Sequence, residues 1–144
     1  MTDLVATAGQ PSEEELAAVA RAGFDVVVNL ALHDAEYSLP DERRTVESLG
    51  MRYIHIPVVW ERPIRADLER FIEVMDGLTG KPVFVHCAAN KRVSAFMALY
   101  RQLRQRWAAD ATMPDVLAIW EPDAVWQQFM EQMTQAMTSG RNHG

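Results

Sequence analysis

The chain has 144 residues and a net charge of −6, with 49% hydrophobic and 24% charged residues. These values are typical of an ordinary globular protein and predict one domain over residues 1–144, with disorder only at 1–4 and 139–144. The acidic balance and the scattered arginines argue against binding to nucleic acid or to a membrane surface. The lone cysteine cannot form an internal disulfide, and no apolar run resembles a signal peptide or a membrane span, so we expect a cytoplasmic protein.

The first part of the chain predicts a helix followed by a buried strand. Ser12 can cap the helix, Glu15 can complete a capping box, and Gly23 ends the helix. The run 24–30 (FDVVVNL) is apolar and β-branched, which is typical of a strand that is buried on both faces.

The same order of helix and strand recurs twice. A helix is predicted over 40–49, with Gly50 as its end, and a strand follows over 51–59. An apolar stripe predicts a helix over 68–78, and the short apolar run 82–86 (PVFVH) predicts a third strand.

This alternation predicts an α/β fold, with a mainly parallel sheet of four to five strands flanked by helices. In such a fold the ligand site lies at the carboxyl ends of the strands, because the connecting loops meet there. The loops that leave the predicted strand ends are 31–39, 60–65 and 87–92.

The C-terminal third predicts helices without strands. An amphipathic helix follows Arg92 as far as Trp107, and two extra helices are predicted over 115–120 and 123–137. The last helix carries a stripe that favours core packing, although a methionine-rich face could instead bind a partner. The stripe consists of Trp126, Met130, Met133 and Met137.

The segment after the third strand contains the candidate reactive residues. Cys87 leaves the strand and Arg92 stands just before the next helix. Free N–H groups at a helix N-terminus stabilise anions and so favour a thiolate, and the planar fork of Arg92 suits a tetrahedral oxyanion. We therefore predict that Cys87 is a nucleophile and that Arg92 holds a small anionic substrate. The alternative is an inert core thiol beside a solvated helix start.

Neighbouring residues are predicted to support this anion site. His86 would tune and orient the thiolate, or would be only a core residue at a strand end. Lys91 would add positive charge, and Ser94 would either donate a hydrogen bond to the sulfur or lie on the helix surface. The backbone N–H donors of the loop come from Ala88, Ala89 and Asn90.

The pair His86-Cys87 leading to Arg92, together with segments 9–12 (GQPS), 28–30 (VNL) and 53–58 (YIHIPV), carries a family resemblance. Over about Val5 to Trp107 the chain resembles the cysteine-dependent protein tyrosine and dual-specificity phosphatases, and more closely the small bacterial phosphatase-like domains. The resemblance implies that Cys87 attacks phosphorus and Arg92 holds the phosphoryl oxygens. An acidic residue on another loop would then protonate the leaving group, and water would cleave the phosphocysteine.

The loop departs from this family in length and composition. It has four residues between Cys87 and Arg92, one fewer than the family has, and none of them is glycine. One residue fewer removes up to about 3.5 Å of chain and one N–H donor. The anion-binding cradle that the N–H groups of the loop would form should therefore be smaller. Asn90 could supply the left-handed conformation that glycine otherwise provides. The spacing resembles that of the rhodanese-type sulfurtransferases, whose cysteine carries a persulfide.

The general acid is the second departure. No aspartate stands where the family has one, near Trp60 and Glu61. Glu61 is the predicted acid, and Asp34 or Glu36 on the neighbouring loop are alternatives.

These observations rank three functions. Phosphomonoester hydrolysis comes first, a persulfide sulfurtransferase second, and a non-catalytic anion-binding module third. The sequence leaves the oligomeric state open. No metal or cofactor is implied, because the single cysteine and the four dispersed histidines lack the spacing of metal ligands. These histidines are His33, His55, His86 and His143.

Overall fold

Four parallel strands form the centre of the computed structural model, which describes residues 5–31, 41–59, 61–87, 91–103, 116, 119 and 122–143. From 137 to 143 only the backbone is described. The strands are β1 (Val5–Ala8), β2 (Val26–Asn29), β3 (Arg52–His55) and β4 (Val83–His86). Their spatial order is β1-β4-β2-β3, so β4 and β2 occupy the middle of the sheet. The predicted α/β fold with a parallel sheet is confirmed.

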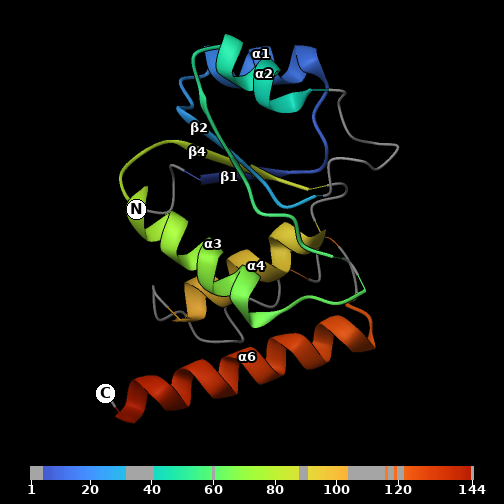
Figure 1. The fold of residues 1–144 in the computed structure, drawn as a ribbon, viewed down its shortest axis with the longest axis vertical. Helices are drawn as coiled ribbons and strands as arrows, with labels where there is room; N and C mark the ends of the chain where they lie inside the picture. The colour runs from blue at the N-terminus through green and yellow to red at the C-terminus, as the bar shows by residue number, and fades with distance from the viewer. Residues whose placement is uncertain are drawn as a thin grey trace.

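Helices cover both faces of this sheet. α1 (Glu13–Arg21) and α2 (Glu42–Ser48) lie over one face. α3 (Arg65–Gly77), α4 (Lys91–Leu103) and α6 (Ala124–His143) lie over the other, with α6 outermost (Figure 1). The three predicted strands are present with shorter bounds. β1 was not predicted as a strand, because its four residues (VATA) are only half-buried and carry no strong apolar pattern.

The helix boundaries follow the local chemistry that the sequence predicts. The Ser12 hydroxyl accepts a hydrogen bond from the Glu15 N–H at 3.0 Å, and the Glu15 carboxylate accepts one from the Ser12 N–H at 2.9 Å. This reciprocal pair is the predicted capping box. Gly23 and Gly50 follow α1 and α2 with φ of 97° and 83°, a left-handed conformation that glycine adopts without a Cβ clash.

The core is divided into two layers by the sheet. Val26 and Val28 of β2 face the layer under α3, α4 and α6, and Val27 faces the layer under α1 and α2. All three are buried, so the prediction that β2 is covered on both faces is confirmed. The same alternation continues along β4, where Val85 faces the first layer and Phe84 the second.

Helix α6 closes the layer beyond α4. Trp126 has its ring centroid 6.1 Å from that of Phe96 on α4, and Phe129 stacks on Phe96 at 6.0 Å. Met130 and Met133 are buried in the same cluster, so the core interpretation of this stripe is confirmed for its described members. The side chain of Met137 lies outside the described residues.

Two further predictions concern the end of the chain and the helix expected over 115–120. The backbone of α6 continues to His143, past Ser139, where the sequence predicts disorder to begin. The helix predicted over 115–120 falls mostly outside the described residues, although Val116 within it is helical and fully buried.

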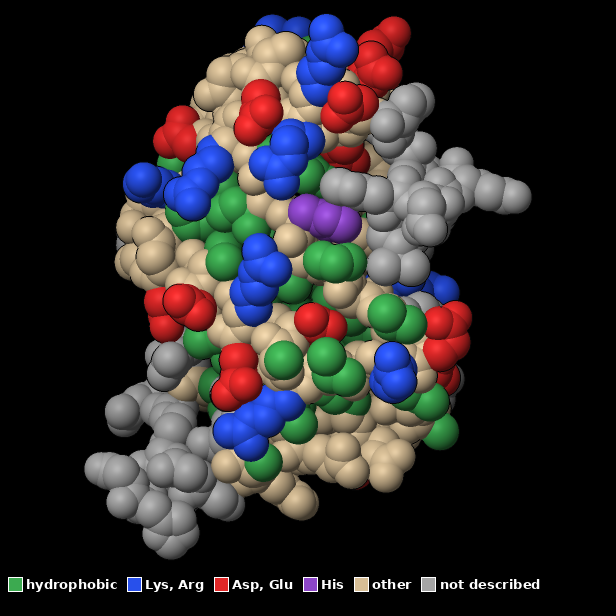
Figure 2. Space-filling model, in the orientation of Figure 1, with side chains coloured by type: hydrophobic (Ala, Val, Ile, Leu, Met, Phe, Trp, Pro, Cys, Tyr) green, Lys and Arg blue, Asp and Glu red, His purple; other side chains and the backbone are tan. Residues whose placement is uncertain are grey.

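The surface carries charges of both signs. Figure 2 shows lysine and arginine side chains interspersed with aspartate and glutamate over the face in view, without a continuous basic patch on that face. Among the described residues, no helix combines the length and the apolar character that crossing a bilayer requires.

Candidate active site

The carboxyl ends of the four strands meet in one row. In the strand register, His86 at the end of β4 pairs with Ala8 of β1 and Asn29 of β2, and Asn29 pairs with His55 of β3. Three of these four residues carry polar side chains, whereas the two central strands β4 and β2 are apolar in the rows behind this one. The row marks the sheet edge where parallel α/β folds bind their ligands.

Cys87 is the first residue beyond this row. Its thiol is free, 1% of its surface is exposed, and it belongs to the apolar layer under α3, α4 and α6. Its N–H donates a hydrogen bond to the Ala8 carbonyl at 3.3 Å, so the backbone remains attached to the sheet at this residue. His86 points to the opposite face, because successive residues of a strand alternate.

Arg92 and Ser94 lie in the first turn of α4. Arg92 is 7% exposed, so its side chain is buried. It follows Cys87 by five residues in the sequence. The Ser94 hydroxyl donates to the Lys91 carbonyl at 2.7 Å. A hydroxyl has one proton to donate, so the predicted hydrogen bond from Ser94 to the sulfur would require this one to break.

The N–H cradle of the loop stays a prediction. Its residues Ala88, Ala89 and Asn90 lie outside the described residues. The loop was predicted to run to Arg92, with the helix after it, but α4 begins at Lys91, so Lys91 and Arg92 both lie in its first turn.

A buried polar cluster lies beneath α2, on the face opposite Cys87. Nε2 of His86 lies 2.5 Å from Oε2 of Glu42, the first residue of α2. Oε1 of Glu42 accepts a second hydrogen bond from the side-chain amide of Gln10 at 2.9 Å. His86 and Glu42 are 0% and 4% exposed. We call Gln10, Glu42 and His86 the acid–imidazole cluster.

Glu42 and Gln10 were not predicted as site residues. An acidic residue in the first turn of a helix is ordinary, because it interacts favourably with the helix dipole. Gln10 belongs to the GQPS segment that contributes to the family resemblance, which was the only signal for it.

A second polar pair joins β2 to β3 at the same edge. The side-chain amide of Asn29 donates to the Tyr53 hydroxyl at 2.9 Å, and its carbonyl accepts from the Ala31 N–H at 2.8 Å. Burial of the phenol raises the pKa of Tyr53, the nearby Glu42 raises it further, and the Asn29 hydrogen bond opposes the rise. Tyr53 is thus a neutral hydroxyl that accepts from Asn29, the last residue of β2.

Glu61, the predicted acid, is exposed in a turn after β3. The Arg62 N–H donates to the Val59 carbonyl at 3.1 Å and closes that turn. β3 is an edge strand with β2 between it and β4, so the strand ends that lead to Glu61 and Cys87 are about 10 Å apart. The alternative acids Asp34 and Glu36, as well as Trp60, lie outside the described residues.

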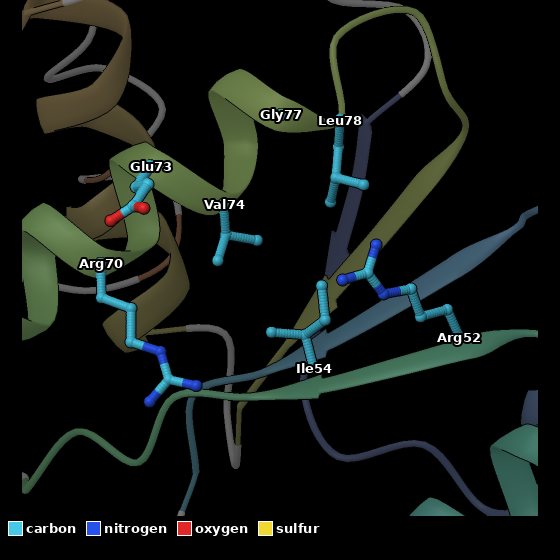
Figure 3. A pocket seen from close by; sticks show the side chains of 7 residues that line it. All are labelled: Arg52, Ile54, Arg70, Glu73, Val74, Gly77 and Leu78. Atoms are coloured by element: carbon cyan, nitrogen blue, oxygen red, sulfur yellow. The ribbon is translucent and has the colours of Figure 1, made fainter.

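Two open pockets of about 390 Å³ each lie in the described part of the chain, away from Cys87 and Arg92. Figure 3 shows the first, between the edge strand β3 and helix α3, with an apolar floor and two arginines. It is lined by Arg52, Ile54, Arg70, Glu73, Val74, Gly77 and Leu78. The second is lined by residues of α1, by the segment 8–11, which includes Gln10, and by Phe84 of β4. No group of three or more metal-binding side chains occurs within the described ranges.

Comparison with known proteins places this arrangement in a family. A family model described as a DSP-PTPase phosphatase fused to NAD+ kinase matches residues 3–142. A DUF442 protein from Shewanella putrefaciens CN-32, named a candidate phosphatase, is 34% identical; the match covers 93% of this chain and 88% of that one, with a TM-score of 0.83. No protein in the curated set matches.

More distant structures share the fold. The catalytic domain of the PP-IP phosphatase SIW14 from S. cerevisiae is 15% identical over 96% of this chain and 88% of that one, with a TM-score of 0.74. TpbA from P. aeruginosa, in complex with pTyr, is 18% identical over 90% of this chain and 83% of that one, with a TM-score of 0.62. The family match over residues 3–142 and the 34% identity to the Shewanella protein assign the chain to a family. The chain belongs to the dual-specificity and protein tyrosine phosphatase-like family.

Proposed function

We propose that this protein hydrolyses a phosphomonoester through a phosphocysteine on Cys87. One observation supports this most strongly: Cys87 follows the central strand β4 at the carboxyl edge of the sheet, and Arg92 is buried in the first turn of the next helix. A strand end supplies a rigid nucleophile, and a helix start supplies N–H donors for an anion. Membership of a phosphatase-like family agrees with this chemistry.

The proposed reaction has two displacements. The Cys87 thiolate attacks phosphorus and forms a P–S bond while the bond from phosphorus to the ester oxygen breaks. The leaving oxygen takes a proton from Glu61. Water then attacks the same phosphorus and gives a proton to the Glu61 carboxylate, the P–S bond breaks, and inorganic phosphate and the thiolate are released. Arg92 would hold the equatorial oxygens through both steps as a bidentate donor.

The substrate is a phosphorylated protein side chain or a phosphorylated small molecule. Both classes occur among proteins of this fold, since TpbA was solved with pTyr and SIW14 is a PP-IP phosphatase. The small cradle predicted for the loop favours a single terminal phosphoryl group. A panel of phosphotyrosine and phosphoserine peptides and inositol phosphates would establish the class.

The test is turnover of an aryl phosphate by reduced, folded protein. We expect phosphate release from p-nitrophenyl phosphate, complete loss in Cys87→Ser, and trapping of a phosphorylated Cys87 by rapid acid quench and mass spectrometry. A folded and reduced sample that releases no phosphate from any member of the panel would reject the proposal.

A second candidate is sulfur transfer, which the four-residue spacing of the loop favours. Here the Cys87 thiolate would attack the outer sulfur of thiosulfate, the S–S bond would break, and sulfite would leave. The persulfide on Cys87 would then pass its outer sulfur to an acceptor thiol. This route needs no general acid and fits a chain that lacks the expected aspartate.

Mass spectrometry separates the two chemistries on the same residue. After treatment with thiosulfate in the absence of reductant, a sulfurtransferase gains one sulfur atom, about 32 Da, on Cys87. A phosphatase gains no sulfur but releases phosphate. If neither reaction occurs but sulfate still protects Cys87 from alkylation, the remaining candidate is the non-catalytic anion-binding module.

A further inference from the structure

The pocket between β3 and α3, shown in Figure 3, has a cation on each side and an apolar middle. Arg52 extends from the edge strand β3 and Arg70 from helix α3, so the two guanidinium groups come from opposite walls. The side chains of Ile54, Val74 and Leu78 lie between them. A ligand that fills this β3–α3 pocket therefore meets a positive charge on either side of an apolar floor.

The lining of the pocket is positively charged, although the whole chain carries a net charge of −6. Among the described residues, no carboxylate lies within ion-pair distance of Arg52 or Arg70. Arg65 on the same helix, by contrast, is paired with Glu69 at 3.4 Å. Glu73 also lines the pocket, but Figure 3 shows its carboxylate turned away from Arg52. The two arginines are therefore available to bind an anionic ligand.

Asp67 is a further carboxylate that interacts with Arg70. Burial raises the pKa of the Asp67 carboxyl, and the charge of Arg70 opposes the rise. Asp67 lies outside ion-pair distance of Arg70 and does not line the pocket. This interaction therefore leaves the guanidinium donors of Arg70 to a ligand.

The size of the pocket suits a small molecule. Its volume of about 390 Å³ lies toward the lower end of the range of about 300–1,000 Å³ that ligand sites occupy. Gly77, the last residue of α3, lines the pocket. A Cβ added to Gly77 would meet nothing within 4 Å beyond its chain neighbours and its own helix backbone. The space over this glycine is therefore open to a ligand.

The pocket is separate from the candidate active site. Arg52 is the first residue of β3, and His55, three residues later, belongs to the row of strand ends beside Cys87. Three residues of a strand span about 10 Å. In addition, β3 is an edge strand, whereas Cys87 follows the central strand β4. A ligand in the pocket and a substrate at Cys87 therefore do not compete for the same space.

We propose that the β3–α3 pocket binds a small organic dicarboxylate, whose apolar middle covers the floor and whose two carboxylates are held by Arg52 and Arg70. A guanidinium binds a carboxylate through parallel hydrogen bonds. Two carboxylates carry a charge of −2 and balance the two arginines, whereas two phosphate groups would carry about −3 to −4 beside Glu73. This site goes beyond the proposed function, because none of its lining residues takes part in the Cys87 reaction.

The test uses nonanedioate, a nine-carbon dicarboxylate, as the probe. In a titration of the nitrogen-15-labelled protein followed by NMR, we expect saturable shifts of the amide signals of the lining residues. The dissociation constant should rise roughly two- to fivefold in Arg52→Gln and in Arg70→Gln, which is the effect of losing an exposed ion pair. Arg44→Gln, an exposed arginine of α2 outside the pocket, is the matched control and should bind as the wild type does. Unchanged binding in both pocket variants would overturn the inference.

Two related probes separate charge from apolar contact. Propanedioate carries both carboxylates but almost no apolar body, and 1,9-nonanediol carries the apolar body without charge. Both should shift the signals of the lining residues at much higher concentrations than nonanedioate does. A diol that binds as tightly as nonanedioate would show that the arginines do not select the ligand, and would overturn the inference.

Gly77→Leu tests whether the probe occupies the pocket itself. The new side chain fills the open space over α3, so the shifts should disappear, whereas Gly77→Ala should retain most of the binding. Circular dichroism checks that both variants are folded. Full binding by a folded Gly77→Leu protein would place the probe elsewhere and overturn the inference. Cys87→Ser should bind nonanedioate as the wild type does, so failure of the proposed phosphatase function leaves this test intact.

Discussion

The N–H of Cys87 donates a hydrogen bond to the carbonyl of Ala8, so β1, an edge strand of only four residues, holds the backbone of the candidate nucleophile. Cys87 is therefore held by the sheet although it lies one residue beyond the end of β4.

Arg92→Lys keeps a positive charge but removes the planar fork. If Arg92 holds a tetrahedral anion through two parallel hydrogen bonds, the inhibition constants of phosphate and sulfate should rise about tenfold or more, because a lysine binds such an anion as a point charge. Competitive inhibition of aryl phosphate hydrolysis measures this. Arg70→Lys, an exposed arginine on α3, is the control, and an equal effect of both variants would show that Arg92 is not the anion ligand.

Glu61→Gln tests the predicted general acid. Loss of a general acid typically slows a reaction about 10²–10⁴-fold, and the loss is largest when the leaving group is poor. We expect kcat to fall strongly for alkyl phosphates and little for p-nitrophenyl phosphate, while Glu69→Gln on α3 has no effect on either. A uniform decrease over a series of leaving groups would assign the acid to another residue.

Insertion of a glycine between Ala89 and Asn90 restores the loop length of the related phosphatases. The insertion adds up to about 3.5 Å of chain and one N–H donor, which should enlarge the cradle and give the phosphoryl oxygens one more donor. We expect the ratio of phosphate hydrolysis to persulfide formation to rise. An inserted protein that folds but shows an unchanged ratio would mean that loop length does not select the chemistry.

Trp126→Ala tests how α6 contributes to stability. Trp126 is fully buried against Phe96 and Phe129, and the cavity left by a deleted aromatic side chain costs about 3–5 kcal/mol. Urea unfolding followed by circular dichroism should report this loss, while the neighbouring Val125→Ala should cost under about 0.5 kcal/mol, since Val125 is 46% exposed. Equal losses would mean that α6 is not part of the folded core.

Tyr53 should make the protein sensitive to alkaline pH. Its pKa in the folded state is raised above the unfolded value of about 10, so the stability it contributes is present below pH 10 and is lost as pH rises further. The free energy of unfolding should fall by about 1.4 kcal/mol per pH unit above that point. In Tyr53→Phe this decline should be weaker. At pH 7 the free energy of unfolding of this variant should be about 1 kcal/mol lower than that of the wild type, because the hydrogen bond to Asn29 is lost. Parallel slopes for the two proteins between pH 9 and 11 would contradict the assignment.

The alternation of helix and strand could be predicted because local signals agree with the tertiary structure. Ser12, Glu15 and Gly23 set the bounds of α1 within a few residues, and the valines of β2 reveal a strand buried on both faces. β1 could not be predicted in the same way. β1 pairs with β4, which is far away in the sequence, and four weakly apolar residues show no pattern from which that pairing could be predicted.

The candidate site could be predicted only where its residues are close in sequence. Cys87 and Arg92 are five residues apart and carry a recognisable chemistry, and the fold places them at the carboxyl edge of the sheet, while their catalytic roles stay a prediction. Glu42 is 44 residues from His86, and its first-turn position gives no sign that it is buried. A contact between two distant elements emerges only when the helices are packed on the sheet.

His86 and Cys87 are consecutive residues that face opposite layers of the molecule, because His86 contacts Glu42 of α2 and Cys87 lies in the layer under α3, α4 and α6. A substitution in α2 is therefore felt first by His86, and a substitution in α3, α4 or α6 is felt first on the side of Cys87. The sheet lies between the two layers, so the surroundings of these two neighbouring side chains can be varied separately.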